Sequence, residues 1–195
     1  MKEIEIKAHV YDREKLIKQI ETFAKYEQQV SRRDTYYRLN LDEKISGKDH
    51  ISVRIRKENK KTENGIEYTN YITYKQKELK ASSIEVNEEK ESIIENPEVF
   101  ESILSDTGYT VSLHKTKEVI DYSTDTEFGK ANLEICNVQY LGDFLEIEIL
   151  TETDDDTEIS RIQEELKKLL SKCGINEKDV EKRYYSELLK EINKD

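Results

Sequence analysis

MKEIEIKAHV, residues 1–10, alternates charged and apolar side chains. Glu3, Glu5 and Lys7 occupy every second position, with isoleucines between them. Since successive side chains of a β-strand point to opposite faces, this spacing predicts a strand with two carboxylates and an ammonium on one face. For one such strand taken alone, an edge strand whose charged face meets solvent is the simplest explanation.

The same spacing of charges returns in five later segments. The pairs are Arg54 and Arg56, Lys75 and Lys77, Glu89 and Glu91, Lys115 and Lys117, and Glu146 and Glu148. A solvated face usually mixes both signs, because adjacent like charges repel each other. Here each later pair carries one sign, and the opposite faces of the same strands carry apolar residues. If amphipathic helices cover the apolar faces, the charged faces point into the molecule.

The composition limits the class of protein. A chain of 195 residues suits a single domain, and its 12 tyrosines and regular apolar alternation indicate a folded protein despite a charged content of 38%. No apolar run reaches the roughly 18 residues of a membrane span, and the charged start has no signal-peptide core. We therefore expect a cytoplasmic protein without a membrane partner. The net charge of -11 argues against nucleic acid as a ligand.

The chain is predicted to contain eight strands and four helices in one domain, residues 1–195. After the first strand, a helix spans 12–26, capped by Asp12, and strands cover 34–39, 51–57, 67–77 and 83–94. A helix then starts at Asn96 and Pro97, and strands follow at 111–122, 131–138 and 143–150. Helices over 158–172 and 177–192 complete the chain, so the strands lie within about 2–150 and the C-terminal helices within about 156–193.

Long antiparallel strands with few helices favour a closed sheet, because an open sheet leaves unpaired edges. The predicted fold is therefore α+β, an eight-stranded antiparallel barrel with helices packed on the outside. A barrel of this size can hold a ligand cavity, and a cavity lined by both signs of charge needs water or a ligand that pairs with both. A metal-bound polyphosphate does so, since divalent cations bind carboxylates while arginine and lysine bind phosphate oxygens.

A set of motifs in fixed order resembles a known family. EIEIK (3–7) is similar to the ExExK signature of the triphosphate tunnel metalloenzymes, or CYTH superfamily, which includes class IV adenylyl cyclases and thiamine triphosphatases. The resemblance continues through DTYY (34–37), SVRIR (52–56), ITYK (72–75), VNEEKE (86–91), HKTKE (114–118) and YLGDFLEIEI (140–149). It covers about residues 1–150 and implies an eight-stranded tunnel that holds a triphosphate.

The resemblance also implies roles for individual residues. Ligands for Mg²⁺ or Mn²⁺ would be Glu3, Glu5, Glu134, Glu146 and Glu148, and the triphosphate would be bound by Lys7, Arg54, Arg56, Lys75, Lys115, Lys117 and Arg183. Glu89 and Glu91 would orient these cations or a second metal, and Glu3, Glu5 and Lys7 would be the catalytic residues. Family members commonly have arginine where Lys117 stands, and a lysine offers a point contact in place of a fork.

Three functions fit these residues. We expect hydrolysis of a phosphoanhydride bond in a small-molecule triphosphate: thiamine triphosphate, tripolyphosphate or ATP. The alternative is a class IV adenylyl cyclase that converts ATP to cyclic AMP and pyrophosphate, and a second alternative is a non-catalytic module that binds polyphosphate or nucleotides. A homodimer remains open, and Cys136 and Cys173 receive no chemical role.

Overall fold

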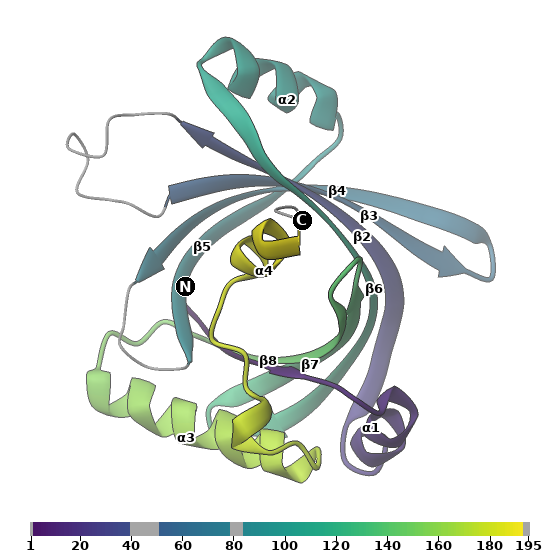
Figure 1. Cartoon of the computed structure of the whole chain (residues 1–195), viewed down its shortest axis with the longest axis vertical. Helices are drawn as coiled ribbons and strands as arrows, with labels where there is room; N and C mark the ends of the chain where they lie inside the picture. Colours follow the sequence, from purple (N-terminus) through teal and green to yellow (C-terminus); the bar gives the residue numbers. More distant parts are fainter. Residues whose placement is uncertain (1, 40–50, 79–83, 193–195) are drawn as a thin grey trace.

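In the computed structural model, which describes residues 2–39, 51–78 and 84–192, the eight strands of these ranges close into an antiparallel barrel (Figure 1). The strands are β1 (Lys2–His9), β2 (Lys25–Leu39), β3 (Ile51–Thr62), β4 (Gly65–Glu78), β5 (Glu85–Ile94), β6 (Tyr109–Thr126), β7 (Gly129–Val138) and β8 (Gly142–Thr151). Around the barrel their order is β1-β5-β4-β3-β2-β6-β7-β8. The predicted eight-stranded antiparallel barrel is thus confirmed.

Four α-helices accompany the barrel in the described ranges: α1 (Arg13–Ile20), α2 (Pro97–Asp106), α3 (Asp156–Lys172) and α4 (Tyr185–Ile192). The predicted caps are confirmed, since Asp12 accepts from the Lys15 amide at 3.0 Å and Asn96 from the Val99 amide at 3.4 Å. α1, α2 and α3 lie outside the barrel wall, whereas α4 lies within its outline (Figure 1). None of the described helices is long and apolar enough to span a bilayer.

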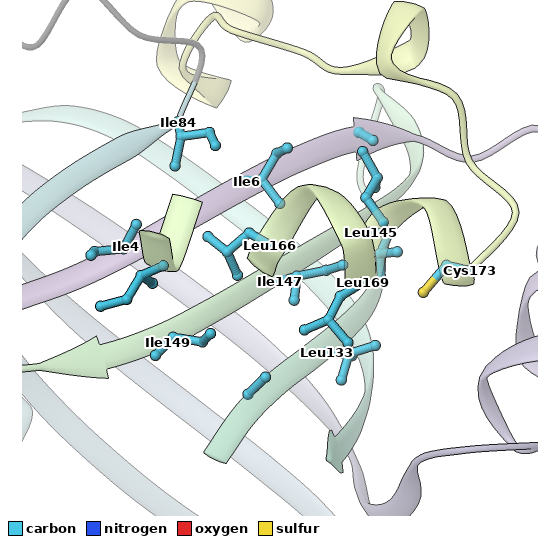
Figure 2. Close-up of a cluster of buried hydrophobic side chains, with 14 of the residues drawn as sticks. Ile4, Ile6, Ile84, Leu133, Leu145, Ile147, Ile149, Leu166, Leu169 and Cys173 are labelled. Carbon is cyan, nitrogen blue, oxygen red and sulfur yellow. The ribbon is translucent and has the colours of Figure 1, made fainter. Parts of the chain in front are cut away.

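The main hydrophobic core lies between α3 and the outer face of β1, β7 and β8 (Figure 2). α3 carries Ile159, Ile162, Leu166 and Leu169 at helical spacing, and these side chains are buried. They pack on the alternate residues of the strands, which include Ile4, Ile6, Leu133, Leu145, Ile147 and Ile149. Because every second residue is committed to this core, the residues between them must face the barrel interior.

The first helix is shorter than predicted. α1 ends at Ile20, whose carbonyl accepts from the Phe23 and Ala24 amides at 3.0 and 2.9 Å. From Lys25 onward the chain pairs with β6 over the whole length of β2, so tertiary strand pairing replaces the predicted last turn of helix.

The last predicted helix, 177–192, is also wrong over its first half. A short 3-10 turn spans Glu177–Asp179, and Val180 then bridges to Ala8 of β1. The Glu181 amide donates to the Lys7 carbonyl at 2.8 Å, so this segment is bound to a strand edge and the helix starts only at Tyr185. We call residues 180–184 the strap.

Candidate functional site

The barrel encloses a cavity of about 640 Å³, within the size range of small-molecule sites. Among the described residues that line it, nine are acidic and nine are basic. Each of the described strands contributes side chains from its inner face, as the alternation of charged and apolar residues predicts. The cavity is therefore highly charged but close to neutral in sum.

Carboxylates of the first and last strands meet on one wall of the cavity. Glu3 and Glu148 share a side-chain hydrogen bond, and the Asn132 amide donates to Glu148 Oε1 at 2.9 Å. Burial favours a raised pKa at Glu3, but Lys75, whose Nζ lies 3.2 Å from Glu3 Oε2, shifts that pKa below its usual value. Burial and the charge of Glu3 hold the pKa of Glu148 well above its usual value. The pKa values of these two contacting acids are therefore shifted in opposite directions.

A second pair of carboxylates faces the cavity from β7 and β8. Glu134 and Glu146 are direct neighbours in the sheet register, and Lys117 Nζ lies 2.8 Å from Glu134 Oε1 and 2.6 Å from Glu146 Oε2. Burial favours a raised pKa at Glu134, but Lys117 and Arg32 outweigh it, so this pKa is lowered. Lys117, expected to bind phosphate, therefore also holds two of the expected metal ligands.

Arg54 and Lys75 enter the cavity from neighbouring strands β3 and β4. Arg54 Nη2 donates to Glu91 Oε2 at 3.0 Å and lies 3.7 Å from Glu89 Oε2. Glu89 also forms an ion pair with Lys75. Glu89 and Glu91 thus contact the cations that they were expected to orient. A guanidinium has five N–H groups, so these contacts fix Arg54 without using all its donors.

Asp34 of β2 anchors two more cations, although it was not predicted as a site residue. It accepts from Arg56 Nε at 2.7 Å and Nη2 at 3.0 Å, and Lys115 Nζ lies 3.3 Å from its Oδ2. Its side chain is fully buried. Burial favours a raised pKa, but Arg56 and Lys115 outweigh it and hold the pKa of Asp34 well below its usual value. Asp34 thereby holds both cations in place.

Arg32 was not predicted as a site residue either. It stands two residues before Asp34 and therefore lies on the same face of β2. Its Nε donates to Glu58 Oε2 at 2.7 Å and its Nη2 to Asp121 Oδ2 at 2.9 Å, and its Nη1 bonds to Glu134. The guanidinium therefore links β2 to three other strands, β3, β6 and β7, beside an expected metal ligand. The pattern of like charges two residues apart does not include Arg32, because the next residue on its face, Asp34, is acidic.

The remaining predicted residues divide into two groups. Glu5 and Lys7 line the cavity, and Lys7 is only 4% exposed. Arg183 does not line it: its side chain is 48% exposed and pairs with Glu181 at 2.7 Å and Glu191 at 2.9 Å. These two acids hold Arg183 on the surface, so the expectation that it binds phosphate is not supported. The side chain of Lys77 lies outside the described residues.

The donor set fits a hard divalent cation. Ligand atoms of Glu134, Cys136 and Glu146 lie within 4.8 Å of one another. Burial raises the pKa of the Cys136 thiol, which disfavours the thiolate that a metal would need. The contact between Glu3 and Glu148 marks a second place in the cavity where carboxylates gather. Carboxylate oxygens are the ligands that Mg²⁺ and Mn²⁺ favour.

Known proteins share the sequence pattern and the fold of this chain. Residues 1–185 match the model of the CYTH domain family. The PH1819 protein from Pyrococcus horikoshii has a similar structure, with a TM-score of 0.79, 25% identity, and coverage of 97% of this chain and 99% of that one.

Two other solved structures share the fold. A candidate adenylate cyclase from Vibrio parahaemolyticus has a TM-score of 0.73 and 19% identity, with coverage of 96% of this chain and 97% of that one. HpAC1 from Hippeastrum, a candidate adenylyl cyclase with a dominant triphosphatase activity, has a TM-score of 0.58 and 16% identity, with coverage of 89% and 88%. No curated protein matches the sequence.

Proposed function

The chain belongs to the CYTH domain family, and on that premise we propose that it is a divalent-metal-dependent enzyme that hydrolyses a phosphoanhydride bond of a triphosphate bound inside the barrel. The substrate classes that fit are thiamine triphosphate, inorganic tripolyphosphate and nucleoside triphosphates such as ATP. The site of action would be the cytoplasm.

The observation that carries the proposal is a cavity wall on which acids and cations lie side by side. Acids come from β1, β7 and β8, where Glu3 and Glu148 contact each other. Cations come from β3, β4 and β6, each held by a buried or half-buried acid such as Asp34 or Glu89. A ligand that brings a divalent cation and a chain of phosphates pairs with both signs of charge at once.

Glu3, Glu5, Glu134, Glu146 and Glu148 would hold Mg²⁺ or Mn²⁺. When bound, such an ion neutralises charge on the phosphates and lowers the pKa of a coordinated water. The chain itself supplies the orientation: Asn132 donates to Glu148, and Arg32 and Lys117 position Glu134.

The cations would hold the phosphates and stabilise the charge that develops on them. Arg54, Arg56, Lys75 and Lys115 are each fixed by acids before any ligand binds. Because their positions are set in advance, little reorganisation is required as the phosphoryl group is transferred. A carboxylate of the β1 pair, Glu3 or Glu5, would accept the proton of the attacking water.

Cyclisation of ATP by the ribose hydroxyl is the alternative outcome with the same phosphate-binding residues. Two proteins with this fold are named for different activities, an adenylate cyclase for one and a dominant triphosphatase activity for the other. The fold alone therefore does not distinguish hydrolysis from cyclisation. Hydrolysis is chemically the less demanding reaction, since water needs no positioning of an organic group. A binding module that leaves the triphosphate intact is the second alternative.

Product identification separates the three functions. The purified protein is incubated with tripolyphosphate, thiamine triphosphate and ATP, each with Mg²⁺, with Mn²⁺ and with EDTA. Metal-dependent release of orthophosphate supports hydrolysis, whereas cyclic AMP with pyrophosphate from ATP assigns the cyclase activity.

A melting series completes this experiment. Tripolyphosphate and metal together should raise the melting temperature more than the separate additions do, because both would bind to one site of the folded state. That rise without any product would identify a binding module. No rise and no product would refute the proposed site.

A further inference from the structure

α4 does more than cover the barrel, because its first residue enters the cavity. The strap leads from the edge of β1 to Tyr185, which is 9% exposed and lines the cavity. Tyr185 and Leu188 pack on an apolar part of the inner wall, made of Val30, Val119, Cys136, Val138 and Phe144. Figure 1 shows the helix within the outline of the barrel. The C-terminal segment is therefore built into the charged site.

Three lysines surround the ring of Tyr185. The Nζ atoms of Lys7, Lys117 and Lys115 lie 4.6, 4.9 and 5.1 Å from its centroid. These lysines come from two different strands, β1 and β6, and each is at most 7% exposed. A cation within about 6 Å of an aromatic face is attracted by the ring quadrupole, more strongly where water is excluded. One aromatic ring thus contacts three buried ammonium groups.

The ring itself is held rigidly. Phe144 meets it edge to face, with centroids 5.1 Å apart and planes at 88°. The hydroxyl lies 3.6 Å from the Sγ atom of Cys136. Lys117 and Lys115 are also held from their other sides, by Glu134 with Glu146 and by Asp34. Each of these two ammonium groups is consequently fixed between an acid and the ring.

We infer that Tyr185 is a positioning residue that keeps Lys7, Lys115 and Lys117 converged on one point of the cavity, ready to bind a polyanion. This inference rests on the proposed function, since the polyanion is the triphosphate. Without the ring, mutual repulsion would move the ammonium groups apart. Binding would then require them to be gathered again, at a cost in affinity.

A ring that occupied the place of the phosphates would have the opposite effect. Its removal would then open the site and tighten tripolyphosphate binding. The sign of the change in affinity therefore distinguishes a positioning role from a blocking role.

The experiment measures the dissociation constant for tripolyphosphate with Mg²⁺ in wild type, Tyr185→Phe and Tyr185→Leu. Phenylalanine keeps the ring, so its constant should stay within about 2-fold of wild type, whereas leucine keeps only apolar volume and should weaken binding about 10-fold, the scale of lost cation–π contacts. Leu188→Ala is the packing control on the same helix. It should lower the melting temperature and change the dissociation constant by less than Tyr185→Leu does.

A series of fluorinated phenylalanines at position 185 tests the same inference in case the leucine variant folds poorly. These residues keep the size of the ring and leave no packing void. Each added fluorine weakens the ring quadrupole at nearly constant size, so the dissociation constant should rise step by step. A flat series, tighter binding by Tyr185→Leu, or an equal loss in Leu188→Ala would overturn the positioning role while wild-type binding still supports the proposed function. Absence of tripolyphosphate binding to wild type would refute both.

Discussion

The two faces of β8 are stabilised by different interactions, although their residues alternate along one strand. Leu145, Ile147 and Ile149 point outward and are 0% exposed beneath α3. Glu146 and Glu148 point inward, where Lys117 and Asn132 contact them. The outer face is stabilised by removal of apolar area from water, which depends little on the identity of each partner. The inner face depends on specific partners, because a buried charge without one is costly.

The difference indicates that the outer residues of this barrel supply folding stability, whereas its inner residues supply the chemistry of the cavity. Substitution of an outer residue should cost folding free energy and leave the cavity chemistry unchanged. Substitution of an inner residue should do the reverse, because the contact between two acids such as Glu3 and Glu148 is unfavourable in the empty protein. The predictions below test this separation, in order of decreasing expected effect.

The largest effect is expected at the inner acids of β8. The double variant Glu146→Gln with Glu148→Gln should reduce turnover at least about 1000-fold, roughly 4 kcal/mol of transition-state stabilisation, because neutral amides bind divalent cations poorly. Its melting temperature without metal should not fall by a comparable amount. Steady-state kinetics over a range of Mg²⁺ and Mn²⁺ concentrations, with thermal melts, check both points.

Ile147→Ala is the matched control from the opposite face of the same strand. It should lower the free energy of unfolding by about 2–5 kcal/mol, the cost of a large-to-small change in a core. The turnover number of the folded variant should stay near wild type. Undiminished turnover in the double glutamine variant, with normal metal dependence, would show that these carboxylates are not the metal site.

A smaller effect is expected at the cations of β3. Arg54→Ala and Arg56→Ala should each weaken tripolyphosphate binding by about 1.5–3 kcal/mol, the scale of a hydrogen bond to a charged group. Titration calorimetry measures the change directly. Lys57→Ala, beside Arg56 but on the outer face, removes ion pairs with Glu98 and Glu101 of α2 and should leave binding unaltered. Equal losses at Lys57 and Arg56 would mean that net charge, rather than position, governs affinity.

The smallest effect is expected at Glu181 of the strap, which connects the edge of β1 to Tyr185 in the cavity. The hydrogen bonds from Arg183, and that from His9, outweigh burial and lower the pKa of Glu181 to about 2. Since the folded pKa lies below the unfolded value of about 4.3, Glu181 contributes stability above that value and loses it as the pH falls toward 2. We expect a contribution of about 1–2 kcal/mol, because Arg183 is half exposed and partly screened.

Melting curves of wild type and Glu181→Gln from pH 6 to pH 3 test this linkage. Wild type should be the more stable at pH 6, and the difference should shrink steadily below about pH 4.5. A difference that stays constant over this range would mean that the Glu181 carboxylate is not stabilised by its partners in the folded state.

Much of the barrel could be predicted because period-two alternation was strong in most of its strands. The alternation in β1, β3 and β8 placed Glu3, Arg54 and Glu146 on an inner face, and the cavity lining agrees. β2 was recognised only over 34–39 of its actual Lys25–Leu39, because its first half is largely polar and gains its pairing from β6. The triphosphate and metal roles of these residues stay predictions until they are measured.

Strand alternation alone predicted which side of each strand is charged and that these sides share one interior, because alternation is a local property of the backbone. Which charges meet depended on how the strands come together in the barrel. Asp34 with Arg56, Arg32 with Glu134, and Tyr185 with three lysines join segments far apart in the chain. The position of α4 inside the barrel could not be predicted either, since an amphipathic helix has the same sequence pattern whether it packs outside a barrel or enters it. Contacts of this kind depend on strand register and barrel closure, which no local pattern encodes.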